Sequence, residues 1–357
     1  MSKYRKYLEF IILLLLAGLI IWWFGRRLDW QQVKLAMQRS DWRLIVVAGI
    51  IILLAYLWRA IRWQALLKPL TPASLKEIWI ATCVGFGAVL LIGRAGEVVR
   101  PVALPMRDHR VRPAAAFVTI MIERLYDSIT VLLIFALNLL WLPPIAGSPN
   151  DFKVVRTAGF VLLGVFAVAI TLLIWFKRRS AVLLSWLSRR IEPRSPLGVR
   201  IKQGTISTLD QLATALSVLS DLRLLAISVF WSLLLWGSVA LANLLVCKAF
   251  GISLGWSQVF FVLGCSMVGS AVPTPGGAAG AFHAATLTAL VLLGVAKEQA
   301  AAAAIIIHLI DFGPAALFGL FYFLRGDINM TRLRALITVK AVEHAVEDER
   351  VALAESS

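Results

Sequence analysis

Cysteine, histidine and acidic side chains are scarce in this sequence. Its 357 residues include three cysteines and four histidines, and 20 Asp and Glu stand against 36 Lys and Arg. The cysteines lie inside apolar stretches without the spacing of a metal site, so we expect packing residues rather than ligands; they are Cys83, Cys247 and Cys265. No Walker loop or G-x-S-x-G elbow occurs either. We therefore expect no cofactor, no metal and no catalytic residue.

Apolar residues are abundant instead. They make up 60% of the chain, and the mean hydropathy is +0.82. Soluble domains are nearer half apolar, and here the apolar residues come in blocks of membrane-spanning length, which indicates an all-α polytopic membrane protein. On a soluble protein, the formal net charge of +16 would suggest a nucleic-acid partner. Because the basic residues flank the apolar blocks, we expect contacts with anionic lipid headgroups and no nucleic acid.

The apolar blocks predict about six transmembrane helices and two opposed re-entrant helical hairpins. The full spans are residues 8–24, 44–61, 114–140, 154–176, 222–246 and 300–324, and the hairpins are residues 78–104 and 259–295. Arg59, Arg62 and Lys68 are interpreted as marking the inner end of the second span. The order span, span, hairpin, span occurs twice with opposite orientation. This is the layout of an inverted repeat, whose substrate site lies near the midplane.

Three regions follow from this topology. Residues 1–326 form the transmembrane domain, and residues 327–357 form a cytoplasmic C-terminal tail. Within the domain, residues 177–221 form a basic amphipathic segment, which is either a solvated cytoplasmic loop or a docking segment for anionic lipid. Residues 29–41 are predicted to form a short amphipathic helix on the outer surface. The distribution of Lys and Arg places both termini in the cytoplasm.

The first hairpin carries full charges between two segments that are each too short to cross a bilayer. Its sequence Gly-Arg-Ala-Gly-Glu-Val-Val-Arg-Pro, residues 93–101, places Arg94, Glu97 and Arg100 close to one face of a helix. Two arginines share one nearby acid, so we expect unneutralised positive charge suited to an anion. The planar guanidinium fork suits phosphate oxygens in particular. The alternative is that these side chains only bridge helices.

Other positions at membrane depth complete the predicted substrate-binding site: Glu123, Arg124 and Asp127 in the third span, Gly276, Gly277 and His283 in the second hairpin, and His308 and Asp311 in the last span. The acidic and basic groups of the third span either line the site or simply pair across helices. The two histidines are either neutral hydrogen-bonding residues or titrate near neutral pH for proton coupling, with Glu97 or Asp311 as partner.

At these positions the chain resembles the transmembrane region of the lysylphosphatidylglycerol synthase family, the flippase-like integral membrane proteins. The matching pieces are residues 93–104, Glu123 to Asp127, Pro273 to Gly277 with Gly280 to His283, and His308 to Pro314. Some family members carry a Glu soon after the Pro-Gly-Gly tip, where this chain has His283. The resemblance implies a lipid translocase core. The aminoacyl-transferring domain of some members is not expected, since about thirty residues follow Arg325.

Residues and resemblance together favour a lipid transporter, or flippase, that moves an anionic, phosphate-bearing lipid between leaflets of the bacterial inner membrane. The expected partners are an anionic phospholipid or isoprenoid-linked lipid, together with lipid-synthesis enzymes. A membrane-embedded enzyme, or an accessory subunit of lipid or lipid-linked glycan synthesis, is the alternative. We expect no enzyme activity, because neither a soluble catalytic domain nor a metal motif is recognisable.

Overall fold

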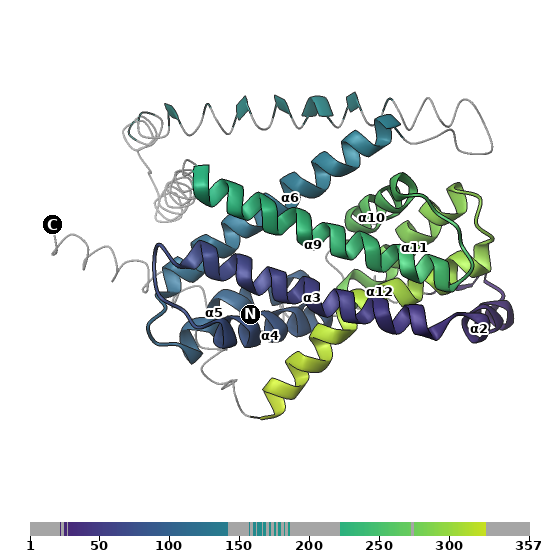
Figure 1. Ribbon diagram of the computed structural model, residues 1–357, viewed down its shortest axis with the longest axis horizontal. Helices are drawn as coiled ribbons and strands as arrows, with labels where there is room; N and C mark the ends of the chain where they lie inside the picture. The colour runs from purple at the N-terminus through teal and green to yellow at the C-terminus, as the bar shows by residue number, and fades with distance from the viewer. Residues whose placement is uncertain are drawn as a thin grey trace, which may run out of the picture.

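The computed structural model of the chain describes residues 28–141, 222–272 and 275–325, with residues 22, 25 and 26 and scattered positions between 157 and 185. These residues form helices and their connections, and no strand occurs among them (Figure 1). The all-α class is therefore confirmed. The predicted spans 8–24 and 154–176, the segment 177–221 and the tail 327–357 lie wholly or largely outside the described residues.

Ten helical elements are described in these ranges, and they follow the predicted blocks closely. In chain order they are α2 (Trp30–Arg39), α3 (Trp42–Leu67), α4 (Leu75–Ile92), the short 3₁₀ helix η1 (Gly93–Val98), α5 (Val99–Arg107), α6 (Pro113–Trp141), α9 (Leu222–Ala249), α10 (Trp256–Ser270), α11 (Pro275–Leu292) and α12 (Lys297–Leu324). The predicted amphipathic helix is α2. Its N-cap Asp29 accepts a hydrogen bond from the backbone N–H of Gln31 at 2.9 Å, and Val33 is its buried residue.

Three helices in the described part of the chain are long and apolar enough to cross a membrane: Trp42–Leu67, Leu225–Ala249 and Lys297–Tyr322. The protein is thus a multi-pass membrane protein. Helix α6, with 29 residues, is about 43 Å long and also exceeds a hydrocarbon core of roughly 30 Å, but three charges lie near its middle. The count of six spans stays a prediction, because two of them fall mostly outside the described residues.

Two pairs of shorter helices occupy the positions of the predicted hairpins. In the first, η1 joins α4 to α5, and the two helices pack against each other. In the second, α10 and α11 pack against each other, and both are shorter than the spanning helices. Helix α11 also contacts both α4 and η1, so the two pairs meet inside the molecule. Whether they enter the membrane from opposite sides stays a prediction.

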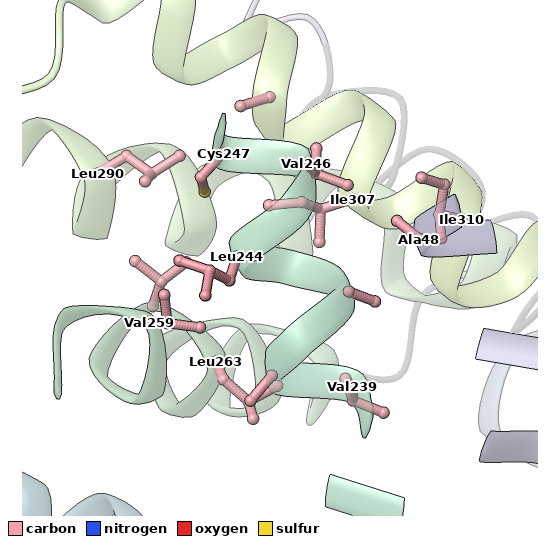
Figure 2. Packing of buried hydrophobic residues seen from close by; sticks show 14 of the residues in the cluster. Ala48, Val239, Leu244, Val246, Cys247, Val259, Leu263, Leu290, Ile307 and Ile310 are labelled. Atoms are coloured by element: carbon pink, nitrogen blue, oxygen red, sulfur yellow. The ribbon is translucent and has the colours of Figure 1, made fainter. Parts of the chain in front are cut away.

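The long helices hold these pairs in place. Helix α3 packs along α9, and α12 crosses α4 (Figure 1). Figure 2 shows the apolar contacts around the second half of α9, where side chains of five helices interdigitate: Ala48, Leu244, Val246, Cys247, Val259, Leu263, Leu290 and Ile307. A run of alanines in α12, residues 300–304, is fully buried, and such small side chains let neighbouring helices approach closely. Cys247 packs in this core as a free thiol, as expected.

The start of α11 has an unusual backbone. Gly276, Gly277 and Ala278 have φ angles of 75°, 63° and 60°, which lie in the left-handed region. Glycine adopts this region without steric cost, whereas an alanine there is strained. The Pro-Gly-Gly sequence therefore interrupts the helix where the sequence predicted a break, and it presents irregular backbone inside the molecule. Such backbone is tolerated at membrane depth only where protein or a cavity covers it.

Candidate functional site

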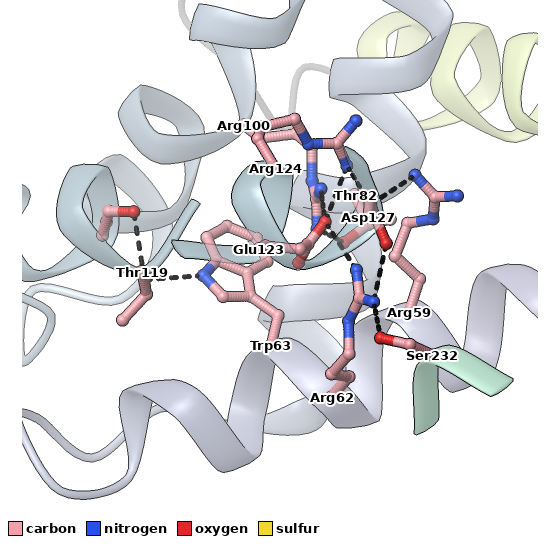
Figure 3. A network of polar contacts seen from close by, with 11 residues as sticks. Arg59, Arg62, Trp63, Thr82, Arg100, Thr119, Glu123, Arg124, Asp127 and Ser232 are labelled. Carbon is pink, nitrogen blue, oxygen red and sulfur yellow. Dashed lines mark hydrogen bonds and ion pairs between the residues drawn. The ribbon is translucent and has the colours of Figure 1, made fainter. Parts of the chain in front are cut away.

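Charged side chains from α3, α5 and α6 form one buried network, shown in Figure 3. Glu123 on α6 lies at its centre and is fully buried. Arg100 on α5 donates from Nη1 to Glu123 Oε1 at 2.6 Å and from Nη2 to Oε2 at 3.4 Å. Arg124 Nη2 donates to the same Oε1 at 2.8 Å, and Arg62 Nη2 on α3 lies 3.5 Å from it. Three guanidinium groups therefore surround this single carboxylate.

Asp127, one turn further along α6, forms the second centre of the network. Arg62 Nη1 donates to its Oδ1 at 2.7 Å and to the hydroxyl of Ser232 on α9 at 2.6 Å. Arg124 Nη2 lies 3.2 Å from Oδ2, and Arg59 Nη1 lies 4.0 Å from it. Because Arg62 is completely buried, its two partners fix the position of its guanidinium group.

Aromatic rings frame the arginines. The guanidinium carbon of Arg100 lies 4.6 Å from the ring centroid of Trp63, and that of Arg59 lies 4.5 Å from the ring centroid of Phe86. These distances are within the range of cation–π attraction. The Trp63 indole donates to Thr119 Oγ1 at 3.0 Å, which fixes its ring. The Arg100 side chain crosses α4 at Gly85, where an added Cβ would lie only 2.0 Å from Arg100 Cγ.

The network divides into a neutral inner part and a cationic outer part. Arg62 and Arg100, whose side chains are 0% and 3% exposed, each bind one of the two carboxylates. Arg59 and Arg124, 12% and 31% exposed, supply two further positive charges. Arg124 Nε is buried and has no hydrogen-bond partner in the described part of the chain. Arg62 Nε, Arg62 Nη2 and Arg100 Nε are likewise buried without a hydrogen-bond partner in these ranges, so the network holds more donors than its two carboxylates satisfy.

These outer arginines face a cavity of about 480 Å³. Its wall is formed mainly by apolar side chains of α3, α6, α9 and α10, including Ile52, Val131, Leu132, Phe135, Val239 and Met267. The charged residues on its wall are Arg59, Glu97, Arg124, Asp127 and Asp311. Both helix pairs contribute, through Val89 and Glu97 on one side and Gly277 and Ala278 on the other. The cavity can therefore hold a molecule with a long apolar part and a negatively charged group.

Asp311 reaches the cavity from the middle of α12. Its two carboxylate oxygens are buried and have no hydrogen-bond partner among the described residues. The Tyr56 hydroxyl on α3 donates to the backbone carbonyl of Asp311 at 2.7 Å, which joins the two helices without satisfying the carboxylate. Glu97 is half-buried on η1 and is close enough to Arg124 to interact with it electrostatically.

The two histidines lie together beside the cavity rather than on its wall. The ring centroids of His283 and His308 are 4.7 Å apart. His308 Nε2 is 3.3 Å from the carbonyl oxygen of Gly277 in the left-handed turn. Phe282 and Phe312 pack against the His308 ring at centroid distances of 5.1 and 4.9 Å. This arrangement favours hydrogen-bonding and packing roles for the pair.

The structure brings most of the predicted site residues together, but it distributes their roles differently. Glu97, Arg124, Asp127, Gly277 and Asp311 line the cavity, whereas Glu123, Gly276 and both histidines lie next to it. Arg94 and Arg100 were expected to share Glu97 as their one nearby acid, and this is wrong for Arg100, which is bound to Glu123. Arg94 lies in η1, and its side chain is outside the part of the chain that the structure describes.

Sequence reasoning missed two arginines of the site. Arg59 and Arg62 were interpreted, together with Lys68, as marking the inner end of a span. Their position at the helix end is wrong, since α3 continues to Leu67 and Arg62 is fully buried, while the side of the membrane on which α3 ends stays a prediction. The available signal was the apolar sequence that resumes after Arg62, with Trp63, Leu66 and Leu67. A helix that stays apolar beyond its charges indicates charges facing inward. Among the described residues, no group of three His, Cys, Asp or Glu could hold a metal ion.

Comparison with known proteins agrees with this architecture. The family model described as the lysylphosphatidylglycerol synthase TM region matches residues 10–319 of the chain. A similar curated protein is the UPF0104 membrane protein PH1989 of Pyrococcus horikoshii. It is 22% identical over 335 residues, which cover 88% of this chain and 95% of the relative. The matched region includes every residue of the charged network and the cavity wall.

Proposed function

This chain belongs to the lysylphosphatidylglycerol synthase transmembrane-region family, and from that premise we propose that it moves an anionic, phosphate-bearing lipid between the two leaflets of a membrane. The observation that carries the proposal is the cavity between the two helix pairs, which combines an apolar wall with two guanidinium groups, those of Arg59 and Arg124, in excess of the two carboxylates of the buried network. Charge inside a membrane is costly and is retained where it serves a substrate or an ion.

Arg124 and Arg59 are the proposed phosphate ligands. Both line the cavity, and both are left over when Arg62 and Arg100 have neutralised the two carboxylates of the inner network. A guanidinium fork binds phosphate oxygens through two parallel hydrogen bonds. In this proposal the buried pair of Arg100 and Glu123 holds α5 against α6 and does not touch the lipid.

The apolar wall is the proposed seat of an acyl or isoprenoid chain. It is formed by side chains such as Val131, Phe135 and Met267 from α6 and α10. Several wall residues are also partly exposed, among them Leu132 and Val268, whose side chains are 37% and 58% accessible. The cavity is therefore bordered by apolar surface that can face lipid, and a chain could extend through this border while its phosphate stays at Arg124.

We further propose that transport proceeds without chemical turnover of the lipid, in the bacterial inner membrane, with both termini in the cytoplasm. An anionic phospholipid or an isoprenoid-linked lipid would fit the charge and the apolar wall equally. Lipid-synthesis enzymes are the proposed protein partners, since they deliver such lipids on one leaflet. An enzyme acting on the headgroup would instead release a product, which headgroup analysis after the transport assay detects.

A reconstituted transport assay tests the proposal. Purified protein is placed in liposomes with fluorescent phosphatidylglycerol, and transfer between leaflets is followed by chemical quenching of the outer leaflet. Loss of one charged hydrogen-bonding group costs about 1.5–3 kcal/mol, so we expect Arg59→Gln and Arg124→Gln to slow transfer by roughly 10- to 150-fold. The exposed Arg43 gives the matched control Arg43→Gln, which should transfer at the wild-type rate.

A fluorescent glucosylceramide, which carries no phosphate, serves as the second lipid in the same liposomes. We expect the wild-type protein to transfer it at the rate of protein-free liposomes. Two results would contradict the proposal: wild-type transfer of phosphatidylglycerol by both cavity variants, or equal transfer of the two lipids.

A further inference from the structure

The carboxylate of Asp311 lacks the arginine hydrogen bonds that the carboxylates of Glu123 and Asp127 accept. Glu123 and Asp127 are each bound by arginines, whereas neither carboxylate oxygen of Asp311 has a hydrogen-bond partner in the described ranges, although both are buried. An isolated ionised carboxylate away from water is strongly disfavoured. Asp311 is therefore a position where a proton, or a change in the neighbouring charge, has a large effect.

The groups around Asp311 come from the elements packed against α12. They are Tyr56, whose hydroxyl donates to the Asp311 carbonyl, and Arg59, both on α3. Cys83 on α4 is a neighbour of Tyr56, and His283 on α11 and His308 on α12 contact each other. Arg59 is a charged neighbour of Asp311, and both side chains line the cavity together with Glu97, Arg124 and Asp127. Tyr56 donates to the Asp311 backbone carbonyl and makes no hydrogen bond with the Asp311 carboxylate.

Arg59 is also a proposed phosphate ligand, so Asp311 and the lipid phosphate compete for one positive charge. In the empty cavity, Arg59 is available to balance an ionised Asp311. When a phosphate arrives, Arg59 has two anionic neighbours, and their repulsion favours protonation of the carboxylate. Binding of phosphate and binding of a proton therefore strengthen each other, and the linkage is reciprocal.

The position of Asp311 along α12 allows this charge change to act on conformation. Pro314 lies three residues later, and it cannot donate the backbone hydrogen bond to the carbonyl of Ile310. Proline inside a helix is a usual site of bending. Gly277 and Phe312, next to this region, belong to the cavity wall as well. A proton on Asp311 thus changes the charge at a weak point of a long helix that crosses α4.

On these grounds we propose that Asp311 takes up one proton when the phosphate-bearing lipid binds and releases it when the lipid leaves, so that lipid and proton cross the membrane together. The proton comes from water on the side where the lipid enters, forms an O–H bond with a carboxylate oxygen, and returns to water on the other side. This proposal rests on the proposed function, and it assigns the energy source of the same site. For a lipid with one negative charge, the combined movement is electroneutral.

Two gradients applied to the same proteoliposomes separate the outcomes. With one-to-one coupling, a pH difference of one unit shifts the final distribution of fluorescent phosphatidylglycerol by up to about tenfold toward the leaflet on the alkaline side. A membrane potential set with potassium and valinomycin at equal pH should leave the distribution even. A sodium gradient at equal pH should also have no effect.

Variants of Asp311 test the residue itself. In Asp311→Asn, whatever rate of transfer remains, the final distribution should be even with and without the pH difference, while Asp311→Glu should restore at least part of the shift. Arg43→Gln is the control and should respond as the wild type does. If the wild-type protein transfers no lipid at all, the proposed function fails. If it transfers lipid but the final distribution does not respond to the pH difference, or responds to potential or sodium instead, the proton coupling alone is overturned. The proposed role of Asp311 in the coupling is also overturned if Asp311→Asn keeps the full response to the pH difference.

Discussion

Replacing Glu123 by Gln should destabilise the folded protein more than any other removal of a single carboxylate in the described part of the chain. Glu123 is fully buried, accepts hydrogen bonds from Arg100 and Arg124, and lies 3.5 Å from Arg62. Glutamine keeps the shape but removes the charge, and its amide group points N–H donors at guanidinium donors. Breaking a buried ion pair by removing one partner costs about 3–5 kcal/mol. The equilibrium constant for unfolding should therefore rise by roughly a hundred-fold to a few thousand-fold.

Unfolding in mixed micelles with an increasing fraction of denaturing detergent measures this change, with tryptophan fluorescence as the signal because Trp63 stacks on Arg100. The matched control is Glu77→Gln, since Glu77 forms a partly exposed ion pair with Arg107. Because both side chains of this pair reach solvent, its loss should cost less than the loss of the fully buried Glu123. The reasoning is refuted if Glu123→Gln loses no more stability than Glu77→Gln does. A second check is the double variant Glu123→Gln with Arg100→Gln, which should lose less than the sum of the two single losses.

Two further changes follow from close contacts in the structure. Gly85→Ala places a Cβ 2.0 Å from Arg100 Cγ, whereas Gly87→Ala meets its nearest atom at 3.5 Å. In the same titration, Gly85→Ala should lower the free energy of unfolding by about 1–3 kcal/mol, and Gly87→Ala should lower it by less. Equal losses of stability would contradict this account of the packing. Asp108, between α5 and α6, accepts two hydrogen bonds from the Arg110 guanidinium, which lowers its pKa to about 2. This contribution to stability is complete above the unfolded-state pKa of roughly 4 and is lost as the pH falls toward 2. Thermal scans should therefore show Asp108→Asn less stable than the wild type at pH 6 and nearly equal to it at pH 2. A stability difference that is the same at both pH values would exclude this role of the Asp108–Arg110 pair.

The sequence was sufficient to predict the helical blocks because they depend on local composition. Apolar stretches of spanning length and the break at Pro273 to Gly277 are properties of neighbouring residues, and apart from the C-terminal end of α3 the described helices begin and end near the predicted positions. The charged group of the third span was recognised for the same reason, since three charges in an apolar helix of 29 residues are conspicuous.

The pairing of these charges could not be predicted, because it joins residues that are distant in the chain. Arg62 binds Asp127 across 65 positions and Ser232 across 170. The apolar residues after Arg62 indicate that its side chain faces inward, but they do not identify its partners. Arg100 follows the same principle. Its nearest acid in the sequence is Glu97, but the packing of α5 against α6 delivers it to Glu123. The balance of charges near a motif in the sequence therefore does not tell which arginine remains available to bind an anion.

The sequence analysis named Asp311, three residues after His308, as one of two alternative partners of the histidines, and the structure separates the roles of His308 and Asp311. His308 turns to His283 and the carbonyl of Gly277, while Asp311 lines the cavity. Three residues correspond to about 300° of helix rotation, so two such side chains diverge by roughly 60°. At a boundary between a cavity and a packed interior, this divergence is enough to place them in different environments.

Native mass spectrometry of the gently extracted protein tests most directly whether the cavity holds a phosphate-bearing lipid at Arg59 and Arg124. The wild-type protein and Arg43→Gln should each retain a bound anionic lipid that contains phosphorus, and the double variant Arg59→Gln with Arg124→Gln should lose it while keeping its fold. Retention of the same lipid by the double variant, at the same occupancy, would contradict the assignment of these two arginines and with it the proposed transport site.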